Sequence, residues 1–98
     1  MTTPEVKVKR KVVALLKEMD AYNFFPVMSG YGRSGIPDII GCYRGVFFAI
    51  ECKAGDNKTT ALQEMQLQKI RDAGGIALII NEENIEHVQA ALRDHTGH

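Results

Sequence analysis

Residues 35–54 read GIPDIIGCYRGVFFAIECKA, and this stretch determines the fold that we expect for the rest of the chain. Two runs rich in Ile, Val, Phe and Tyr, 37–43 and 46–54, are separated by Arg44 and Gly45, which predicts a β-hairpin with a two-residue turn. Both faces of this hairpin are apolar near the turn. We therefore expect it at the centre of a sheet that helices cover on both sides.

Counting outward from the turn places two carboxylates opposite each other. Asp38 faces Glu51, with Cβ atoms about 4.5–5.5 Å apart, and Lys53 follows on the same face, about 7 Å along the strand. Facing carboxylates repel each other unless a cation lies between them, and their oxygens suit a hard divalent ion such as Mg²⁺ or Mn²⁺. A lysine beside such a pair supplies the cationic or proton-exchanging group that phosphodiester cleavage needs. The alternative is a cross-strand ion pair of Lys53 with either carboxylate at a solvated sheet edge.

The spacing from Pro37-Asp38 to Glu51-Cys52-Lys53 resembles the signature of PD-(D/E)xK nucleases. More closely, the run 31–54, followed by Thr60-Ala61-Leu62-Gln63 and Ala73-Gly74-Gly75, resembles the virus-type replication-repair nuclease (VRR-NUC) domain. The matching segments occur in order from Glu5 to about Asn81. The resemblance implies a restriction-endonuclease-like α/β/α core, with a central mixed sheet flanked by helices, in one domain over residues 1–98.

The resemblance also implies a role for each residue of the PD…ExK pattern. Asp38 and Glu51 hold Mg²⁺ or Mn²⁺, and the main-chain carbonyl of Cys52 is a further oxygen ligand. Lys53 orients or deprotonates the attacking water, or stabilises the charge that builds on the phosphate. The residue pattern does not distinguish between these roles of Lys53. It also does not indicate whether one or two metal ions bind.

Two further residues, Glu5 and Gln63, complete the expected site. Glu5 lies in a helix predicted from Pro4 to about Met19, after Thr3 as N-cap, on its inward-facing stripe. In the resembled family a glutamate at this place joins the active site, while interaction with the helix dipole is the alternative. A family glutamine at the position of Gln63 contacts the lysine or the attacking water. Gln63 also stands at capping-box spacing after Thr60.

Charge is segregated along a chain whose formal net charge is zero. Residues 1–17 carry an excess of basic side chains and 81–98 an excess of acidic ones, so the first helix is a candidate phosphate-binding face or merely a solvated one. The glycine-rich loop 30–35 before Asp38 is either a DNA-contacting segment or an ordinary surface loop. The candidate DNA contacts are Tyr31, Arg33 and Ser34 in this loop, Lys58 in the polar loop 54–59, and Lys9 in the first helix.

The remaining elements follow from their apolar patterns. A short edge strand is expected at about 24–28, a helix from Thr60 to about Ala73, a buried strand over 76–80 parallel to the second hairpin strand, and a last helix over 82–94.

The composition and the cysteines indicate a cytoplasmic protein. No apolar run approaches the roughly 20 residues of a membrane span, and the first residues lack the pattern of a signal peptide, so we expect no membrane partner. The hairpin register places Cys42 and Cys52 on opposite faces of the sheet, which disfavours a disulfide. If a phage encodes the protein, the expected compartment is the host cytosol.

Small stand-alone members of the resembled family act on branched DNA such as Holliday junctions, and do so as homodimers. The resemblance thus implies a homodimeric, metal-dependent DNA endonuclease in DNA repair, whose two active sites suit symmetric cutting. The alternatives are a catalytically idle DNA-binding or assembly module of the same fold, a metal-stabilised structural domain, and a sequence-specific restriction-type enzyme.

Overall fold

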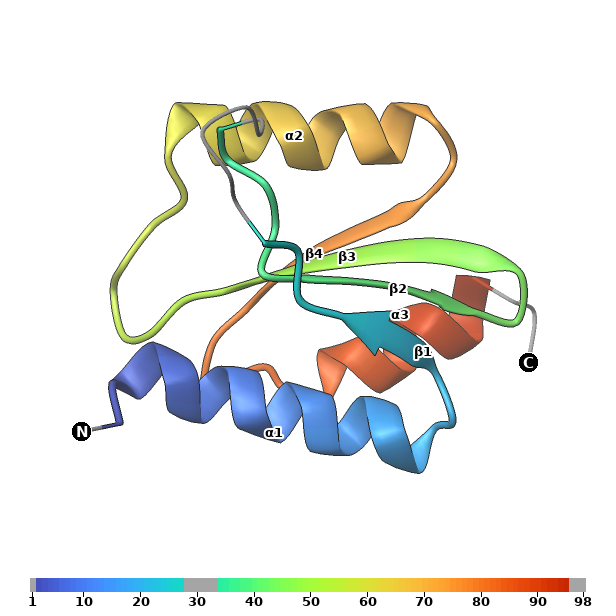
Figure 1. The fold of residues 1–98 in the computed structure, drawn as a ribbon, viewed down its shortest axis with the longest axis horizontal. Coiled ribbons are helices and arrows are strands. Elements are labelled where there is room, and N and C mark those ends of the chain that lie inside the picture. The colour runs from blue at the N-terminus through green and yellow to red at the C-terminus, as the bar shows by residue number, and fades with distance from the viewer. Residues whose placement is uncertain (1, 28–33, 96–98) are drawn as a thin grey trace.

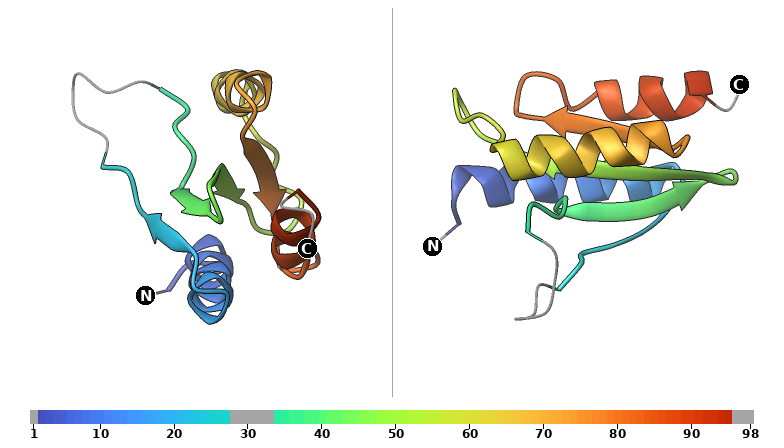
Figure 2. Two further views of the ribbon diagram at one scale, coloured as in Figure 1. Left: turned by 90° about the vertical axis from the view of Figure 1, so that its right-hand side faces the viewer. Right: turned by 90° about the horizontal axis from the view of Figure 1, so that it is seen from above.

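A computed structural model describes residues 2–27 and 34–95 as a four-stranded sheet between two layers of helices. Helices α1 and α3 pack on one face of the sheet and α2 lies over the other (Figures 1 and 2). This is the predicted α/β/α arrangement. In chain order the elements are α1 (Pro4–Glu18), β1 (Tyr22–Phe24), β2 (Ile39–Tyr43), β3 (Val46–Cys52), α2 (Ala61–Asp72), β4 (Ile76–Ile80) and α3 (His87–His95).

The strands lie in the order β1-β2-β3-β4, so the predicted hairpin is at the centre of the sheet. β2 pairs antiparallel with β1 and with β3, whereas β3 pairs parallel with β4. The sheet is therefore mixed, as expected. The helix α2 provides the crossover that a parallel β3–β4 pair requires.

The hairpin turn consists of Arg44 and Gly45, which both have positive φ angles, 50° and 84°. Positive φ at both central residues is the geometry of a type I′ turn, whose twist matches that of the flanking strands. The register runs from Tyr43↔Val46 to Ile39↔Ile50, as counted from the sequence. Both strands are shorter than predicted, so Asp38 lies just before β2 and the strand β3 ends at Cys52.

The main core fills the space between the sheet and the helices α1 and α3. Its fully buried side chains come from alternate positions of the hairpin and from one stripe of each helix; they include Leu16, Ile39, Phe48, Ile50, Val88 and Leu92. Because Gly41 lacks a side chain, the Phe48 ring packs against it; a Cβ there would lie 2.4 Å from the ring and 2.1 Å from the Tyr22 carbonyl oxygen.

The opposite face of the sheet is covered less completely than we predicted. α2 packs on β3 and β4, and it buries only Gln66 and Leu67 of its own residues. Phe47 remains 45% exposed and Cys42 is exposed too. The apolar pattern alone does not distinguish a face that a helix of the same chain covers from one that stays open.

Two predicted boundaries were wrong for local reasons. β1 lies at 22–24 and not at about 24–28, ahead of Pro26, which has no N–H for a sheet bond. α3 begins at His87 and not at 82, because the side chains of Asn81 and Asn84 take up main-chain donors. The Asn81 N–H donates to Asn84 Oδ1 at 2.8 Å, and the Glu83 N–H donates to Asn81 Oδ1 at 2.8 Å. These side-chain bonds compete with a helical first turn.

Over the described residues, no helix has the length and apolarity that crossing a bilayer requires.

Candidate active site

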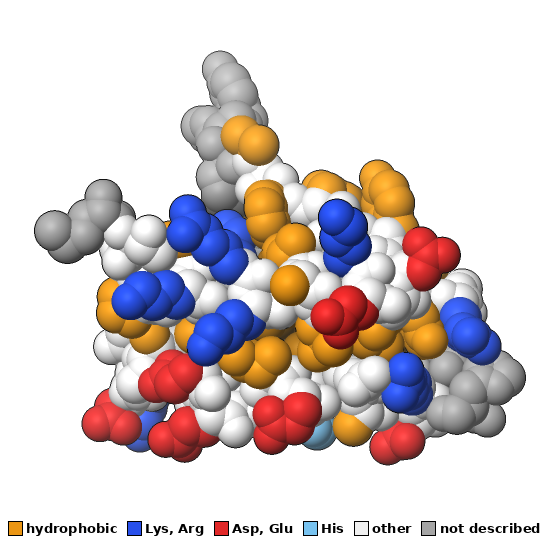
Figure 3. Space-filling view, turned by 90° about the horizontal axis from the view of Figure 1, so that it is seen from below, with side chains coloured by type: hydrophobic (Ala, Val, Ile, Leu, Met, Phe, Trp, Pro, Cys, Tyr) orange, Lys and Arg blue, Asp and Glu red, His pale blue; other side chains and the backbone are white. Residues whose placement is uncertain are grey.

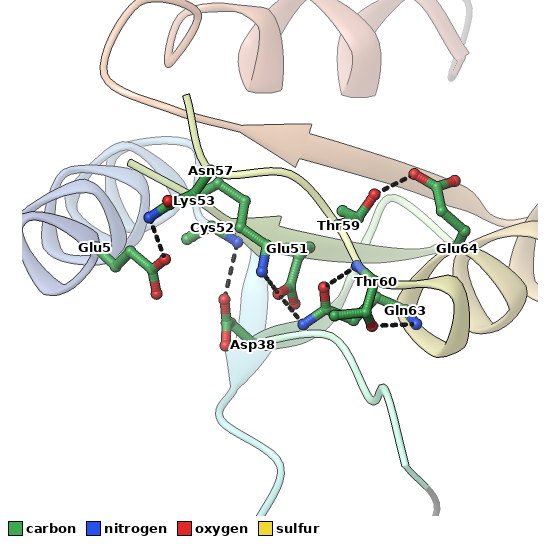
Figure 4. A network of polar contacts seen from close by, with 10 residues as sticks. All are labelled: Glu5, Asp38, Glu51, Cys52, Lys53, Asn57, Thr59, Thr60, Gln63 and Glu64. Carbon is green, nitrogen blue, oxygen red and sulfur yellow. Dashed lines mark hydrogen bonds and ion pairs between the residues drawn. The ribbon is translucent and has the colours of Figure 1, made fainter. Parts of the chain in front are cut away.

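The PD…ExK residues meet at the end of β3, between the N-terminal turns of α1 and α2 (Figure 1). Asp38 stands one residue before β2, and its Oδ2 accepts a hydrogen bond from the Cys52 N–H at 2.8 Å. This bond continues the hairpin past its last paired residues, Ile39 and Ile50. It fixes the Asp38 carboxylate beside Glu51, as Figure 4 shows.

Glu51 is the most buried carboxylate of the site, with 3% of its surface exposed. Its Oε2 accepts a hydrogen bond from Gln63 Nε2 at 2.8 Å and lies 3.4 Å from Lys53 Nζ. Its Oε1 is buried and has no hydrogen-bond partner among the described residues. A buried carboxylate oxygen without a donor is costly, so this atom fits a position next to a cation.

The surroundings raise the pKa of Glu51 from 4.5 to about 7. Burial is the main cause and the neighbouring Asp38 carboxylate adds to it, whereas the Lys53 ammonium acts in the opposite direction. Without a further cation, Glu51 therefore keeps its proton up to about pH 7, well above the range in which an ordinary glutamate loses it.

Gln63 caps α2 and also contacts the site, where its partner is Glu51 and not the lysine that the resemblance implied. Its side-chain oxygen accepts from the Thr60 N–H at 2.9 Å, and its own N–H donates to Thr60 Oγ1 at 3.2 Å, which completes a capping box. The amide nitrogen of the same side chain donates to Glu51. The N-cap of α2 therefore orients a hydrogen-bond donor toward the buried carboxylate (Figure 4).

Lys53 pairs with Glu51 in a sheltered position, not at a solvated sheet edge. The side chains of the pair are 13% and 4% exposed. The Lys53 N–H donates to the Ile80 carbonyl oxygen at 2.9 Å, so the main chain after β3 stays attached to β4. This attachment holds the lysine beside the two carboxylates.

Glu5 joins this end of the molecule from α1. It lines a cavity of about 190 Å³ together with Thr3, Val6, Lys9 and Asp38. Its Oε1 also accepts a hydrogen bond from Asn57 Nδ2 at 3.4 Å. Sequence reasoning missed Asn57, for which the only signal was its place in the polar loop 54–59.

The predicted DNA contacts fall in different places. Lys9 lines the cavity beside Asp38, while Lys58 and Ser34 are exposed in the segments that flank the site. Tyr31 and Arg33 lie outside the described residues.

The donor set fits a hard divalent ion that carboxylates and a main-chain oxygen bind. Across the described residues no three His, Cys, Asp or Glu side chains form a ready metal cluster. The site offers two side-chain donors, Asp38 and Glu51, which are near enough for the Asp38 charge to raise the pKa of Glu51. The Cys52 thiol is not a donor: burial raises its pKa to about 12, and the side chain belongs to the main core. The buried, unpaired Glu51 Oε1 supports this assignment.

The fold is similar to a solved structure described as a VRR_NUC domain. The TM-score is 0.71, with 19% sequence identity over 90% of this chain and 96% of that chain. The predicted likeness to the VRR-NUC fold is thereby confirmed. The chain matches no family model and no curated protein.

Proposed function

We propose that the protein is a Mg²⁺- or Mn²⁺-dependent DNA endonuclease. The observation that carries this proposal is the buried Glu51 carboxylate, with one oxygen unpaired, beside Asp38 and Lys53. In native proteins the large majority of buried polar atoms have a hydrogen-bond partner, so an unpaired buried carboxylate oxygen calls for an explanation such as a bound ion. The similarity in fold to a VRR_NUC domain is in line with this chemistry.

Three oxygen donors are available to the ion: one carboxylate oxygen each from Asp38 and Glu51, and the Cys52 carbonyl. The Cys52 N–H points to Asp38, whereas the Lys53 N–H points to β4. Because N–H and C=O of one strand residue point to the same side, the Cys52 carbonyl faces the side on which Asp38 lies. This geometry supports the assignment of the main-chain oxygen as a ligand.

When bound, the ion polarises the scissile phosphate and lowers the pKa of water. The chain supplies the remaining groups. Lys53 Nζ offers donors to the attacking water or to a phosphate oxygen, and Gln63 holds Glu51 in its orientation. The N-terminal ends of α1 and α2 face the same region, and their positive dipole ends favour a phosphate there.

Strand cleavage with defined variants tests this function. Labelled linear, flap, replication-fork and four-way-junction DNA are incubated with Mg²⁺, with Mn²⁺ or with EDTA. We expect cutting with either metal, none with EDTA, and a loss of roughly 10²–10⁴-fold in Lys53→Ala. Lys17→Ala removes an exposed lysine at the other end of α1, and we expect it to leave cutting unchanged. Wild-type protein that binds DNA but never cuts it points to an idle module; cutting that survives Asp38→Ala and Glu51→Ala refutes the site.

We further propose that two copies act together on branched DNA such as a four-way junction. The open sheet face supports this, since Tyr22, Phe24 and Phe47 lie on it and are 69%, 46% and 45% exposed. Exposed aromatic clusters of this kind mark interaction surfaces. Sedimentation at several concentrations tests the dimer: Phe47→Asp is expected to give a folded monomer, and a wild type that is monomeric at every concentration contradicts the proposal.

A further inference from the structure

A second, larger cavity lies directly beside the one that contains Asp38. It has a volume of about 380 Å³, within the range of about 300–1,000 Å³ of pockets that take small organic groups. Its lining is Val6, Lys9, Arg10, Val13 and Phe25. Val6 and Lys9 also line the Asp38 cavity, so the two hollows share a wall. A ligand that occupies one is adjacent to the other.

The second cavity combines an aromatic ring with cations. Phe25 is 48% exposed, and Lys9 Nζ lies 4.2 Å from the centroid of its ring. Arg10, which also lines the cavity, is exposed. In Figure 3, Lys and Arg side chains gather over the N-terminal half of α1, with hydrophobic side chains beside them. A basic surface interleaved with an accessible aromatic ring is suited to a nucleic-acid strand, because phosphates meet the cations and a base stacks on the ring.

We propose that this cavity, which we call the α1 pocket (Val6, Lys9, Arg10, Val13 and Phe25), binds one unpaired base of the DNA strand that the active site cleaves. For the base to stack on Phe25, the Lys9 ammonium leaves the ring that it covers. The base then lies between the two valines, and Lys9 and Arg10 meet phosphates. In a duplex both faces of a base are already stacked, so only an unpaired base offers a face to Phe25. The inference rests on the proposed nuclease function and supplies a physical reason for a preference for branched DNA.

Binding measurements test the pocket separately from cleavage. The background is Lys53→Ala, which keeps DNA intact, and the probe is a forked DNA with 2-aminopurine at an unpaired position next to the branch. We expect its fluorescence to be quenched on binding. Adding Phe25→Ala should abolish the quenching and weaken binding roughly 5- to 150-fold, as loss of one base–aromatic stack does. Phe25→Trp, which keeps an aromatic ring, should retain both the quenching and the wild-type affinity for the fork.

The same variants on fully paired DNA of equal length are the control. Phe25→Ala should leave duplex binding unchanged, and Phe25→Leu, which preserves the apolar packing, covers the case in which the alanine variant does not fold. The base-binding proposal is overturned if quenching is unchanged in both Phe25→Ala and Phe25→Leu, or if these variants weaken duplex and fork binding equally. This holds even if the enzyme cuts DNA. Quenching that depends on Phe25 in a wild type that never cuts refutes the nuclease and leaves base binding intact. Protein that binds no DNA overturns both.

Discussion

At the scale of single residues, the raised pKa of Glu51 makes the stability of the metal-free protein depend on pH. Its value is 4.5 in an ordinary setting and about 7 in the fold, mainly through burial. Between these values the folded state holds a proton that the unfolded chain has released. The free energy of unfolding therefore falls as pH rises from about 4.5 to 7, by roughly 3 kcal/mol, and is level above that range.

Thermal unfolding of Glu51→Gln from pH 4 to pH 9 in EDTA checks this prediction. The variant cannot ionise, so its Tm should exceed that of the wild type by a margin that grows up to about pH 7. Glu86→Gln, an exposed glutamate, is the control and should keep the wild-type pH profile. Mg²⁺ at pH 8 should raise the Tm of the wild type but not that of Glu51→Gln. If the margin by which the Tm of Glu51→Gln exceeds that of the wild type shrinks as pH rises, the burial argument is contradicted.

Gln63 offers a separate prediction because it belongs both to a helix cap and to the site. Thr60→Ala removes the hydroxyl of the capping box but leaves the Gln63–Glu51 bond, and we expect a cost of about 0.5–2 kcal/mol in unfolding free energy. Gln63→Ala should cost a similar amount of stability and in addition lower kcat roughly 10- to 100-fold, since a hydrogen bond to a charged group is lost. Equal kcat values in the two variants would reduce Gln63 to a capping residue.

At the scale of elements, Gly35 is where the segment that carries Asp38 meets α2. Its φ angle is +78°, and a Cβ there would lie 2.5 Å from the carbonyl carbon and oxygen of Leu62. Gly74 has a φ of +96° but open space around it. Gly74→Ala should therefore cost only the backbone strain, about 1–2 kcal/mol. Gly35→Ala adds a clash with the main chain of α2, typically 1–3 kcal/mol.

Activity distinguishes the two glycines further. Gly35→Ala should push Asp38 away from Gln63 and Glu51, so cutting falls in protein that remains folded by circular dichroism. Gly74→Ala lies at the far end of α2 and should cut normally at the same temperature. If both variants lose activity in proportion to their stability, the contact of Gly35 with α2 does not position the site.

These elements also show what local sequence can specify. The turn Arg44-Gly45 sets the hairpin register. Because side chains alternate between the two faces of a strand, this register also brings Asp38 close to Glu51. The capping box fixes the start of α2 in the same local way. The Glu5–Asn57 bond joins residues 52 positions apart, and the open face around Phe47 depends on where α2 settles. Neither the Glu5–Asn57 bond nor the open face around Phe47 can be predicted from a single segment of the sequence.

At the scale of the whole molecule, the zero net charge conceals a basic side and an acidic side. All five Lys and Arg residues of positions 1–17 lie on α1, whereas 81–95 carries four acidic side chains and one arginine. Figure 3 shows Lys and Arg side chains gathered over the N-terminal half of α1, and a group of Asp and Glu along the opposite border of this face. DNA binding through such a surface must weaken with salt, since each neutralised phosphate releases condensed counterions.

The salt dependence of DNA binding in charge variants tests which side of α1 the DNA contacts. With forked DNA, the pocket contacts phosphates of the unpaired strand, so the slope of log K against log salt concentration should change by about 0.7 for each phosphate contact removed. Lys9→Gln with Arg10→Gln, on the side of α1 that lines the pocket, should reduce the slope by about 1.4. Lys7→Gln with Lys11→Gln removes the same charge from exposed positions that do not line the pocket and should leave the slope near the wild-type value. An equal reduction in both pairs would mean that the charge of α1 attracts DNA without a defined path past Phe25.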